Sequence, residues 1–341
     1  SGLSISQILE QFPGCKADLI PVLTQLEAKQ FCTFIPKMAD TGQTLQLHVT
    51  NKCNLCCSHC YMRSGAALEY ELTLSEIQSL FYNFKSVGGI YVTLTGGELS
   101  TRADICDILH TAKSIGLTPI VLSNGVGWSD EFFSAVCAAK PSRVQISIDG
   151  YDENSYALVR GRHAFHEALN TVDRLLAQDV PVQISVTPAY QVATEHSEEL
   201  IRFISNLNTQ YSNKPFSVVF SYELLPGRSL SKNFVDKINS DYRSALEKID
   251  SALTPDSDLK SFAANFQDGE ILNNCGYGRL NVAANGDVYF CSQFENVNTY
   301  ANIRTHSFEA IWALACKARA LSDISHLRPC QDCELRYICG G

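Results

Sequence analysis

The sequence of 341 residues is poor in positive charge and in long apolar runs. Its 27 Lys and Arg residues are outnumbered by 36 Asp and Glu residues, which gives a net charge of -9. A nucleic-acid-binding surface needs a basic footprint, so we expect no nucleic-acid partner. No apolar stretch approaches the roughly 20 residues that cross a bilayer, and no signal peptide is recognisable, so we expect no membrane association.

Cysteine, by contrast, is abundant, with 14 residues in the chain. Eight of them stand at spacings typical of metal ligands, which fits a reducing compartment better than a disulfide framework, so we expect a cytoplasmic protein. Cys56 lies between such positions, and we interpret it as a bystander. The other five fall in apolar patterns and are expected in the core: Cys15, Cys32, Cys106, Cys137 and Cys316.

A short segment near residue 55 carries three of these thiols. Cys53, Cys57 and Cys60 have the spacing Cys-x3-Cys-x2-Cys, and soft thiolates suit iron–sulfur clusters and zinc. A loop this tight can turn three sulfurs toward one metal centre but supplies no fourth, and an open coordination position is typical of a catalytic site. Two alternatives remain: a zinc knuckle, with His59 as the nearby fourth ligand, and ordinary buried thiols.

Strand and helix patterns alternate from residue 45 onward. Such alternation predicts a parallel sheet with crossover helices. The predicted strands are 45–50, 90–95, 119–123, 143–148, 182–186 and 216–221. Six units are two fewer than a full barrel contains, and 341 residues leave room for smaller appended modules.

Polar residues and glycines cluster at the ends of these predicted strands, where parallel barrels place their active residues. Gly96 and Gly97 follow the second strand and allow a backbone to approach a ligand closely, and Glu98 can accept from an ammonium group. The next two strands end in Ser123, Asn124, Ser147 and Asp149. Turn formation alone is the alternative interpretation for these polar residues.

The two flanking regions have different patterns. Residues 1–44 contain two short amphipathic helical patterns followed by a strand pattern. Residues 256–341 are rich in cysteine, with five thiols at ligand spacings: Cys275, Cys291, Cys330, Cys333 and Cys339. Zinc is the alternative to iron for these five thiols.

The cysteine segment and the residues that follow it resemble the radical S-adenosylmethionine (SAM) enzymes. Their signature is Cys-x3-Cys-x-aromatic-Cys, and His59 fills the aromatic position. The resemblance implies an α/β fold with a partial (β/α)6 TIM barrel, open on one side for a large substrate. It also implies a [4Fe-4S] cluster on Cys53, Cys57 and Cys60, with SAM bound at the open iron.

The same resemblance assigns SAM contacts to other residues. It places Gly96, Gly97 and Glu98 at the SAM amino group, and Arg160 on the SAM carboxylate. It adds His59, Ser123, Asn124, Ser147 and Asp149 to the cofactor-binding residues, with hydroxyl and carboxylate groups for the ribose.

Both flanking regions also resemble modules found in such enzymes. The tail resembles the SPASM domain, which implies one or two auxiliary [4Fe-4S] clusters on Cys275 and Cys291 and on Cys330, Cys333 and Cys339. The complete domain has two further cysteines, so we expect the tail to be truncated at Gly341. Residues 1–44 resemble the helical half of a winged-helix element that recognises leader peptides, and a helical cap of the barrel is the alternative.

These resemblances imply a three-part enzyme: a partial peptide-recognition element at 1–44, a radical SAM barrel at 45–255 and a SPASM-type domain at 256–341. Its implied activity is that of a peptide maturase, in which a 5′-deoxyadenosyl radical crosslinks a ribosomally made precursor peptide or forms a thioether in it. Its implied partners are that peptide with its leader and an electron donor such as flavodoxin or ferredoxin. The alternatives are sulfatase-maturing-type oxidation of a protein Cys or Ser, peptide epimerisation, and a non-catalytic iron–sulfur scaffold.

Overall fold

The computed structural model describes residues 44–253, 277–291, 299–323, 327–328 and 330–332. The helical and strand patterns predicted before residue 44 lie outside this described part of the chain. So do three of the predicted auxiliary ligands, Cys275, Cys333 and Cys339.

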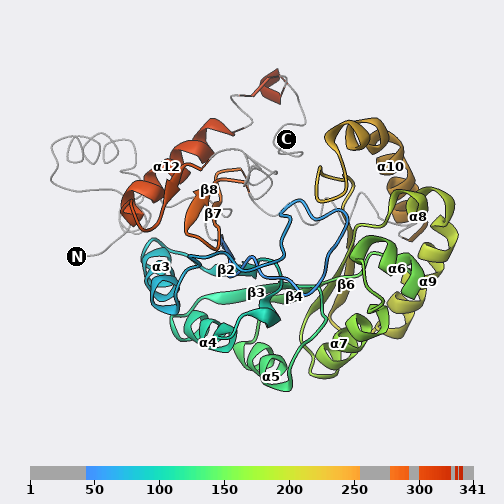
Figure 1. The fold of residues 1–341 in the computed structure, drawn as a ribbon, viewed down its shortest axis with the longest axis horizontal. Coiled ribbons are helices and arrows are strands. Elements are labelled where there is room, and N and C mark those ends of the chain that lie inside the picture. The colour runs from blue at the N-terminus through green and yellow to red at the C-terminus, as the bar shows by residue number, and fades with distance from the viewer. Residues whose placement is uncertain (1–43, 254–276, 292–298, 324–326, 329, 333–341) are drawn as a thin grey trace, which may run out of the picture. The chain divides into compact units, whose positions relative to one another are not determined.

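Six parallel strands form the centre of the fold (Figure 1). They are β1 (Thr44–His48), β2 (Tyr91–Thr95), β3 (Thr118–Ser123), β4 (Arg143–Ser147), β5 (Val182–Val186) and β6 (Phe216–Phe220). They pair in sequence order, so β1 and β6 do not meet, and the barrel is partial and unclosed. The six predicted strands and the partial (β/α)6 barrel are confirmed.

The sheet continues past β1 into the carboxyl-terminal region. Three short strands follow: β7 (Leu280–Val282), β8 (Asp287–Tyr289) and β9 (Ala301–Asn302). β7 pairs with β1 in parallel, and β8 and β9 are added antiparallel, which gives the order β6-β5-β4-β3-β2-β1-β7-β8-β9. The sequence did not predict that both regions share one sheet.

Helices connect the strands and cover the outer face of the sheet (Figure 1). They are α3 (Leu74–Ser86), α4 (Ile105–Ser114), α5 (Asp130–Ala139), α6 (Glu153–Arg160), α7 (Phe165–Ala177), α8 (Tyr190–Glu195), α9 (Ser197–Gln210), α10 (Lys232–Leu253) and α12 (Phe308–Leu321). Two 3-10 turns, η2 (Leu99–Thr101) and η4 (Cys330–Asp332), complete the described elements. Thr73 and Glu76 cap α3 reciprocally, since each side chain accepts from the backbone N–H of the other. No helix in the described part of the chain is long and apolar enough to span a membrane.

Alternation along the strands separates the core from the site. In β4, Val144 and Ile146 are fully buried, while Gln145 and Ser147 line a cavity on the opposite face. Successive side chains of a strand point to opposite faces, so one register places apolar residues in the core and polar residues in the cavity. The fold therefore builds a polar inner surface from the same strands that form its core.

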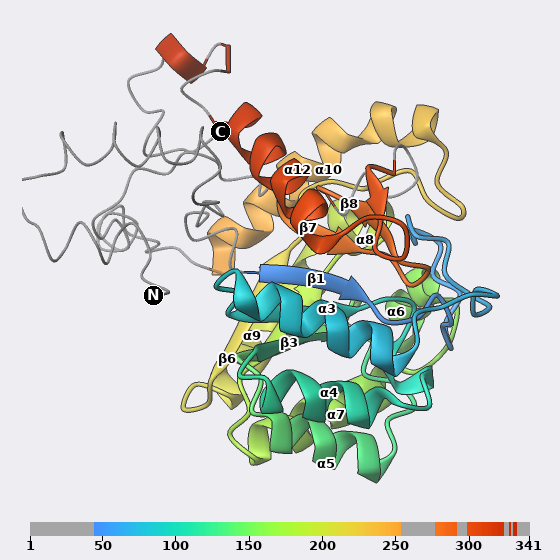
Figure 2. The same cartoon turned by 90° about the vertical axis from the view of Figure 1, so that its left-hand side faces the viewer.

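The segment from β7 to α12 is joined to the barrel by side chains as well as by strand pairing. Arg304 donates from Nε to Glu76 Oε1 at 2.6 Å and from Nη2 to Glu76 Oε2 at 3.0 Å. It also donates to the carbonyls of Tyr70 and Glu71. Figure 2 shows α12, β7 and β8 next to β1 and α3, the elements they contact.

Candidate functional site

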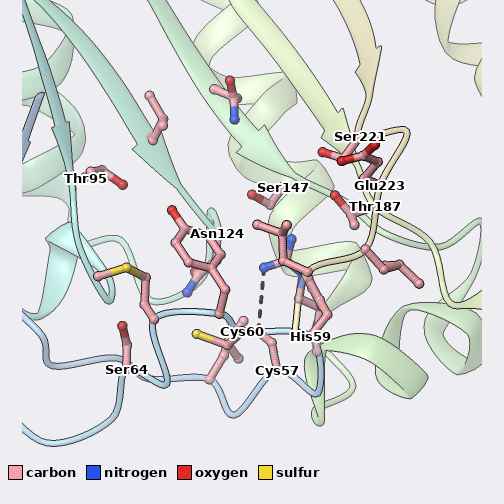
Figure 3. A pocket seen from close by; sticks show the side chains of 18 of the residues that line it. Cys57, His59, Cys60, Ser64, Thr95, Asn124, Ser147, Thr187, Ser221 and Glu223 are labelled. Carbon is pink, nitrogen blue, oxygen red and sulfur yellow. Dashed lines mark hydrogen bonds between the residues drawn. The ribbon is translucent and has the colours of Figure 1, made fainter. Parts of the chain in front are cut away.

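A cavity of about 890 Å³ lies at the carboxyl ends of the parallel strands (Figure 3). The cysteine loop forms one side of it, and Cys53, Cys57 and Cys60 all line it. The strand ends and the segment after β6 complete the wall. Figure 3 shows Cys57, His59 and Cys60 on the loop, with Ser221 and Glu223 on the β6 side.

The segment after β2 holds the beginning of the cysteine loop. Gly97 N donates to Thr50 O and Glu98 N donates to Lys52 O, both at 2.8 Å. A Cβ on Gly97 would lie 2.2 Å from Lys52 O, so no side chain fits there. Gly96 has φ +145, and a Cβ there would lie 2.3 Å from Thr50 O. Both glycines line the cavity, but their first physical requirement is close contact with the cysteine loop.

Two other contacts fix the rest of the loop. Cys53 N donates to Gly65 O at 2.9 Å, which closes the loop on itself. Ser58 N donates to Val159 O at 2.8 Å, which attaches it to α6. A loop held at both points keeps its thiols on the cavity side.

The thiols are partly or fully removed from water. Burial raises the pKa of Cys53 to about 11, and the nearby charges of Glu98 and the other two thiols raise it as well. Burial also raises the pKa of Cys57, although the Arg160 guanidinium opposes this. A cationic metal centre offsets this preference for the neutral thiol, because coordinating thiols bind as thiolates.

The residues present fit a multinuclear cluster with SAM beside it. Three thiols of one loop face a cavity within the usual size range of ligand pockets. Ser64 also lines it, and its buried Oγ has no hydrogen-bond partner among the described residues, so it can serve a ligand. In that part of the chain, no three His, Cys, Asp or Glu side chains are placed to hold a single metal ion. A four-iron cluster is larger than one ion and holds its ligand sulfurs further apart.

Glu98 lies beneath the cavity wall rather than on it. Its side chain is 1% exposed and accepts from Ser123 Oγ at 2.7 Å and Asn124 N at 2.8 Å. Burial raises the pKa of this carboxyl, and those hydrogen bonds oppose the shift. The structure thus brings together three predicted cofactor-binding residues. Ser123 and Asn124 line the cavity, while Glu98 orders the turn that carries them.

Asp149 and Arg160 form a buried ion pair at the end of β4. Arg160 Nη2 lies 2.7 Å from Asp149 Oδ2, and Asp149 is fully buried. Thr187 N donates to the other carboxylate oxygen at 2.7 Å, and Asp149 is not itself among the residues that line the cavity. Arg160 still lines the cavity, and its Nη1 lies 3.6 Å from Cys57 Sγ. His59 Nε2 lies 3.7 Å from the Asp149 carboxylate, and His59 also lines the cavity.

Several lining residues were not found from the sequence. His48, Thr95, Gln145, Thr187 and Ser221 lie on or just after strands, so the strand-end rule could have indicated most of them. On the far wall, Arg243, Glu247 and Asp250 follow the i, i+4, i+7 spacing of one helical face of α10.

The auxiliary thiols are described only in part. Cys291, two residues after β8, and Cys330, at the start of η4, are both half-buried. Their predicted partners lie outside the described residues. Which cysteines bind the auxiliary clusters therefore stays a prediction.

The barrel is open, and three thiols of one loop line the cavity at the carboxyl ends of its strands. This arrangement is typical of proteins that bind a reactive metal cluster. Residues 47–204 match the family model described as the radical SAM superfamily. Residues 274–334 match SPASM, described as an iron–sulfur cluster-binding domain. The chain therefore contains a radical SAM domain and a SPASM domain, and its cofactors are [4Fe-4S] clusters and SAM.

Several known proteins are similar to this chain. The chain is 36% identical over 156 residues to the sporulation killing factor maturation protein SkfB of Bacillus subtilis. The aligned region covers 46% of this chain and 37% of SkfB. It is 26% identical over 331 residues to an AdoMet-dependent heme synthase of Methanosarcina barkeri. That alignment covers 89% of this chain and 92% of the heme synthase. Its fold is similar to that of Streptococcus suis SuiB bound to SAM, with a TM-score of 0.66 and 16% sequence identity. The match covers 98% of this chain and 85% of SuiB.

Proposed function

We propose that this chain is a radical SAM peptide maturase that crosslinks a ribosomally made precursor peptide or forms a thioether in it. The observation that carries the proposal is the cavity, which joins three thiols of one loop to the polar strand ends of an unclosed barrel. An unclosed barrel suits a chain-like substrate better than a sealed one does.

The proposed roles follow from position in the cavity. Cys53, Cys57 and Cys60 hold the cluster, which when bound supplies the electron that cleaves SAM to a 5′-deoxyadenosyl radical. The polar strand ends bind SAM, with Gly96 and Gly97 near its amino group, Ser123, Asn124 and Ser147 near its ribose, and Arg160 near its carboxylate. Glu98 and Asp149 support these contacts from below.

The far wall is proposed to face the peptide. Tyr222 and Glu223 after β6, with Arg243 and Glu247 on α10, line the same cavity as the cysteine loop. Tyr222 Oη donates to Asp250 at 2.7 Å, which orders this wall. The protein's part is to place one substrate carbon near the SAM site and to keep competing reactions out.

The named relatives support a peptide substrate. SkfB is named as a maturation protein, and SuiB has also been solved bound to its precursor peptide SuiA, with TM-score 0.57 to this chain. The heme synthase resemblance extends over more of the chain, so a non-peptide substrate is the second candidate. We further propose a 1–44 recognition element for the leader, a 45–255 barrel and a 256–341 auxiliary domain, with flavodoxin or ferredoxin as electron donor in the cytoplasm.

The test is a mass spectrum of candidate precursor peptides after anaerobic incubation with reconstituted enzyme, SAM and a reductant. Loss of two hydrogens from one peptide segment is the expected result. Unchanged mass with one solvent deuterium incorporated would indicate epimerisation. Turnover of porphyrins with no change in any peptide would overturn the maturase proposal and leave the radical SAM assignment intact.

A further inference from the structure

Arg228 lies where the segment after β6 meets the cysteine loop. Its guanidinium Nη1 lies 3.1 Å from Cys56 Sγ, and Nη2 donates to Ser64 O. Its backbone N donates to Cys60 O at 3.0 Å. Arg228 therefore contacts the cysteine loop at three points: Cys56 in its middle, Cys60 at its last motif cysteine, and Ser64 after it.

The backbone around Arg228 follows the cysteine loop closely. Ser229 N donates to Ser58 O at 2.8 Å. A Cβ on Gly227 would lie 2.8 Å from His59 O, so only glycine fits between the two segments. These backbone contacts hold Arg228 against the loop, where its guanidinium reaches Cys56 and Ser64.

Two arginines lie near the thiols, and they differ in whether a carboxylate pairs with them. Arg160 is paired with the buried carboxylate of Asp149, so that pair is neutral overall. Arg228 forms no ion pair within the described residues, where its contacts are to a sulfur and a carbonyl. A half-exposed positive charge with no ion-pair partner among the described residues therefore sits beside the cysteine loop.

We propose that Arg228 is a positioning residue for the iron–sulfur cluster of the cysteine loop, which it both fixes in place and makes easier to reduce. Adding an electron to a cluster adds negative charge, and a nearby fixed cation stabilises the reduced form. Net charge, hydrogen bonds around the sulfurs and solvent exposure are what set the potentials of such clusters. The inference rests on the cluster and not on the peptide substrate.

The test compares three variants by EPR-monitored redox titration without peptide, following the signal that changes when SAM is added. Arg228→Gln removes the charge, and Arg228→Lys keeps it. Arg63→Gln is the matched control, because Arg63 lies three residues after Cys60 and is exposed, so solvent screens its charge. Iron content and thermal unfolding of each variant report whether the loop and fold are retained.

The expected result is a lower midpoint potential for Arg228→Gln, with Arg228→Lys and Arg63→Gln close to the unaltered chain. Equal potentials for Arg228→Gln and Arg63→Gln would overturn the proposal. So would an equal fall in Arg228→Gln and Arg228→Lys, since that would assign the effect to lost loop geometry rather than to charge. Peptide modification can fail while this result stands, so the two proposals are tested separately.

Discussion

Cys57 is the most buried of the three motif thiols, at 8% exposed, and it lies nearest the ion pair of Arg160 with Asp149. Replacing it with Ala removes one of three cluster ligands and opens only a small space in the core. We expect no 5′-deoxyadenosine from Cys57→Ala and an unfolding temperature within a few degrees of the unaltered chain. Cys106→Ala, which removes a half-buried thiol of α4 outside the cysteine loop, is the control and should keep SAM cleavage. Undiminished 5′-deoxyadenosine from Cys57→Ala would contradict the cluster assignment.

Glu98 offers a second test at the scale of one side chain. Glu98→Ala leaves Ser123 Oγ and Asn124 N without their buried acceptor, which we expect to cost about 2 kcal/mol of unfolding free energy. The turn that lines the cavity then loosens, so SAM binding should weaken about tenfold, measured by calorimetry.

Glu98→Gln is the matched control, because its amide oxygen still accepts one of the two bonds. It should recover part of both losses. Unchanged SAM affinity in Glu98→Ala would mean that this carboxylate does not order the binding turn.

At this scale, the sequence predicted residue identity better than orientation. The three thiols follow from spacing alone, and the polar strand ends follow from the parallel sheet. Whether a carboxylate after a strand faces the cavity or the core depends on partners distant in sequence, as with Asp149 and Thr187, which are 38 residues apart. Ser64 was missed because a lone serine in a loop carries no spacing signal.

Among the elements, the turn after β2 has the strictest steric limit. Gly97→Ala would place a methyl group 2.2 Å from Lys52 O and push the cysteine loop away from β2. We expect that variant to bind less iron after reconstitution, measured by chemical iron assay. Gly65→Ala is the control, since a Cβ there meets nothing within 4 Å. Equal iron contents in the two variants would show that this contact does not hold the loop.

The six strand–helix units were predictable because each strand is a short apolar run bounded by turn residues. The far wall was not, because α10 is read from sequence as an ordinary amphipathic helix with an apolar and a charged face. Only the placement of α10 against the segment after β6, where Tyr222 donates to Asp250, turns part of its charged face into cavity wall.

For the whole molecule, the ion pair of Arg304 with Glu76 links the carboxyl-terminal region to the barrel. Hydrogen bonds from Arg304 lower the pKa of the Glu76 carboxyl to about 2, below its ordinary value of 4.5. A lowered pKa stabilises the fold above the unfolded-state value, and that contribution is lost as pH falls from about 4.5 toward 2. Glu76→Gln should therefore lower the unfolding free energy by about 1 kcal/mol at pH 7, and the deficit should shrink as the pH is lowered through this window.

Denaturant unfolding of both chains at several pH values measures this difference. Glu69→Gln is the control, since the nearby Glu69 is exposed and has no ion pair among the described residues. A deficit in Glu76→Gln that stays constant with pH would assign it to the lost cap of α3 instead.

The pairing of β1 with both β2 and β7 has a consequence for synthesis. Leu45 pairs with Val92 and with Leu280, so one edge of β1 finds its partner within 47 residues and the other only after 235. At about 5–20 residues per second, the second edge stays unpaired for roughly 12–47 s on the ribosome. An exposed strand edge is a template for pairing with other chains. The interval between making β1 and making β7 is therefore the period in which a growing chain is most open to misassembly, and slower translation of the barrel lengthens it.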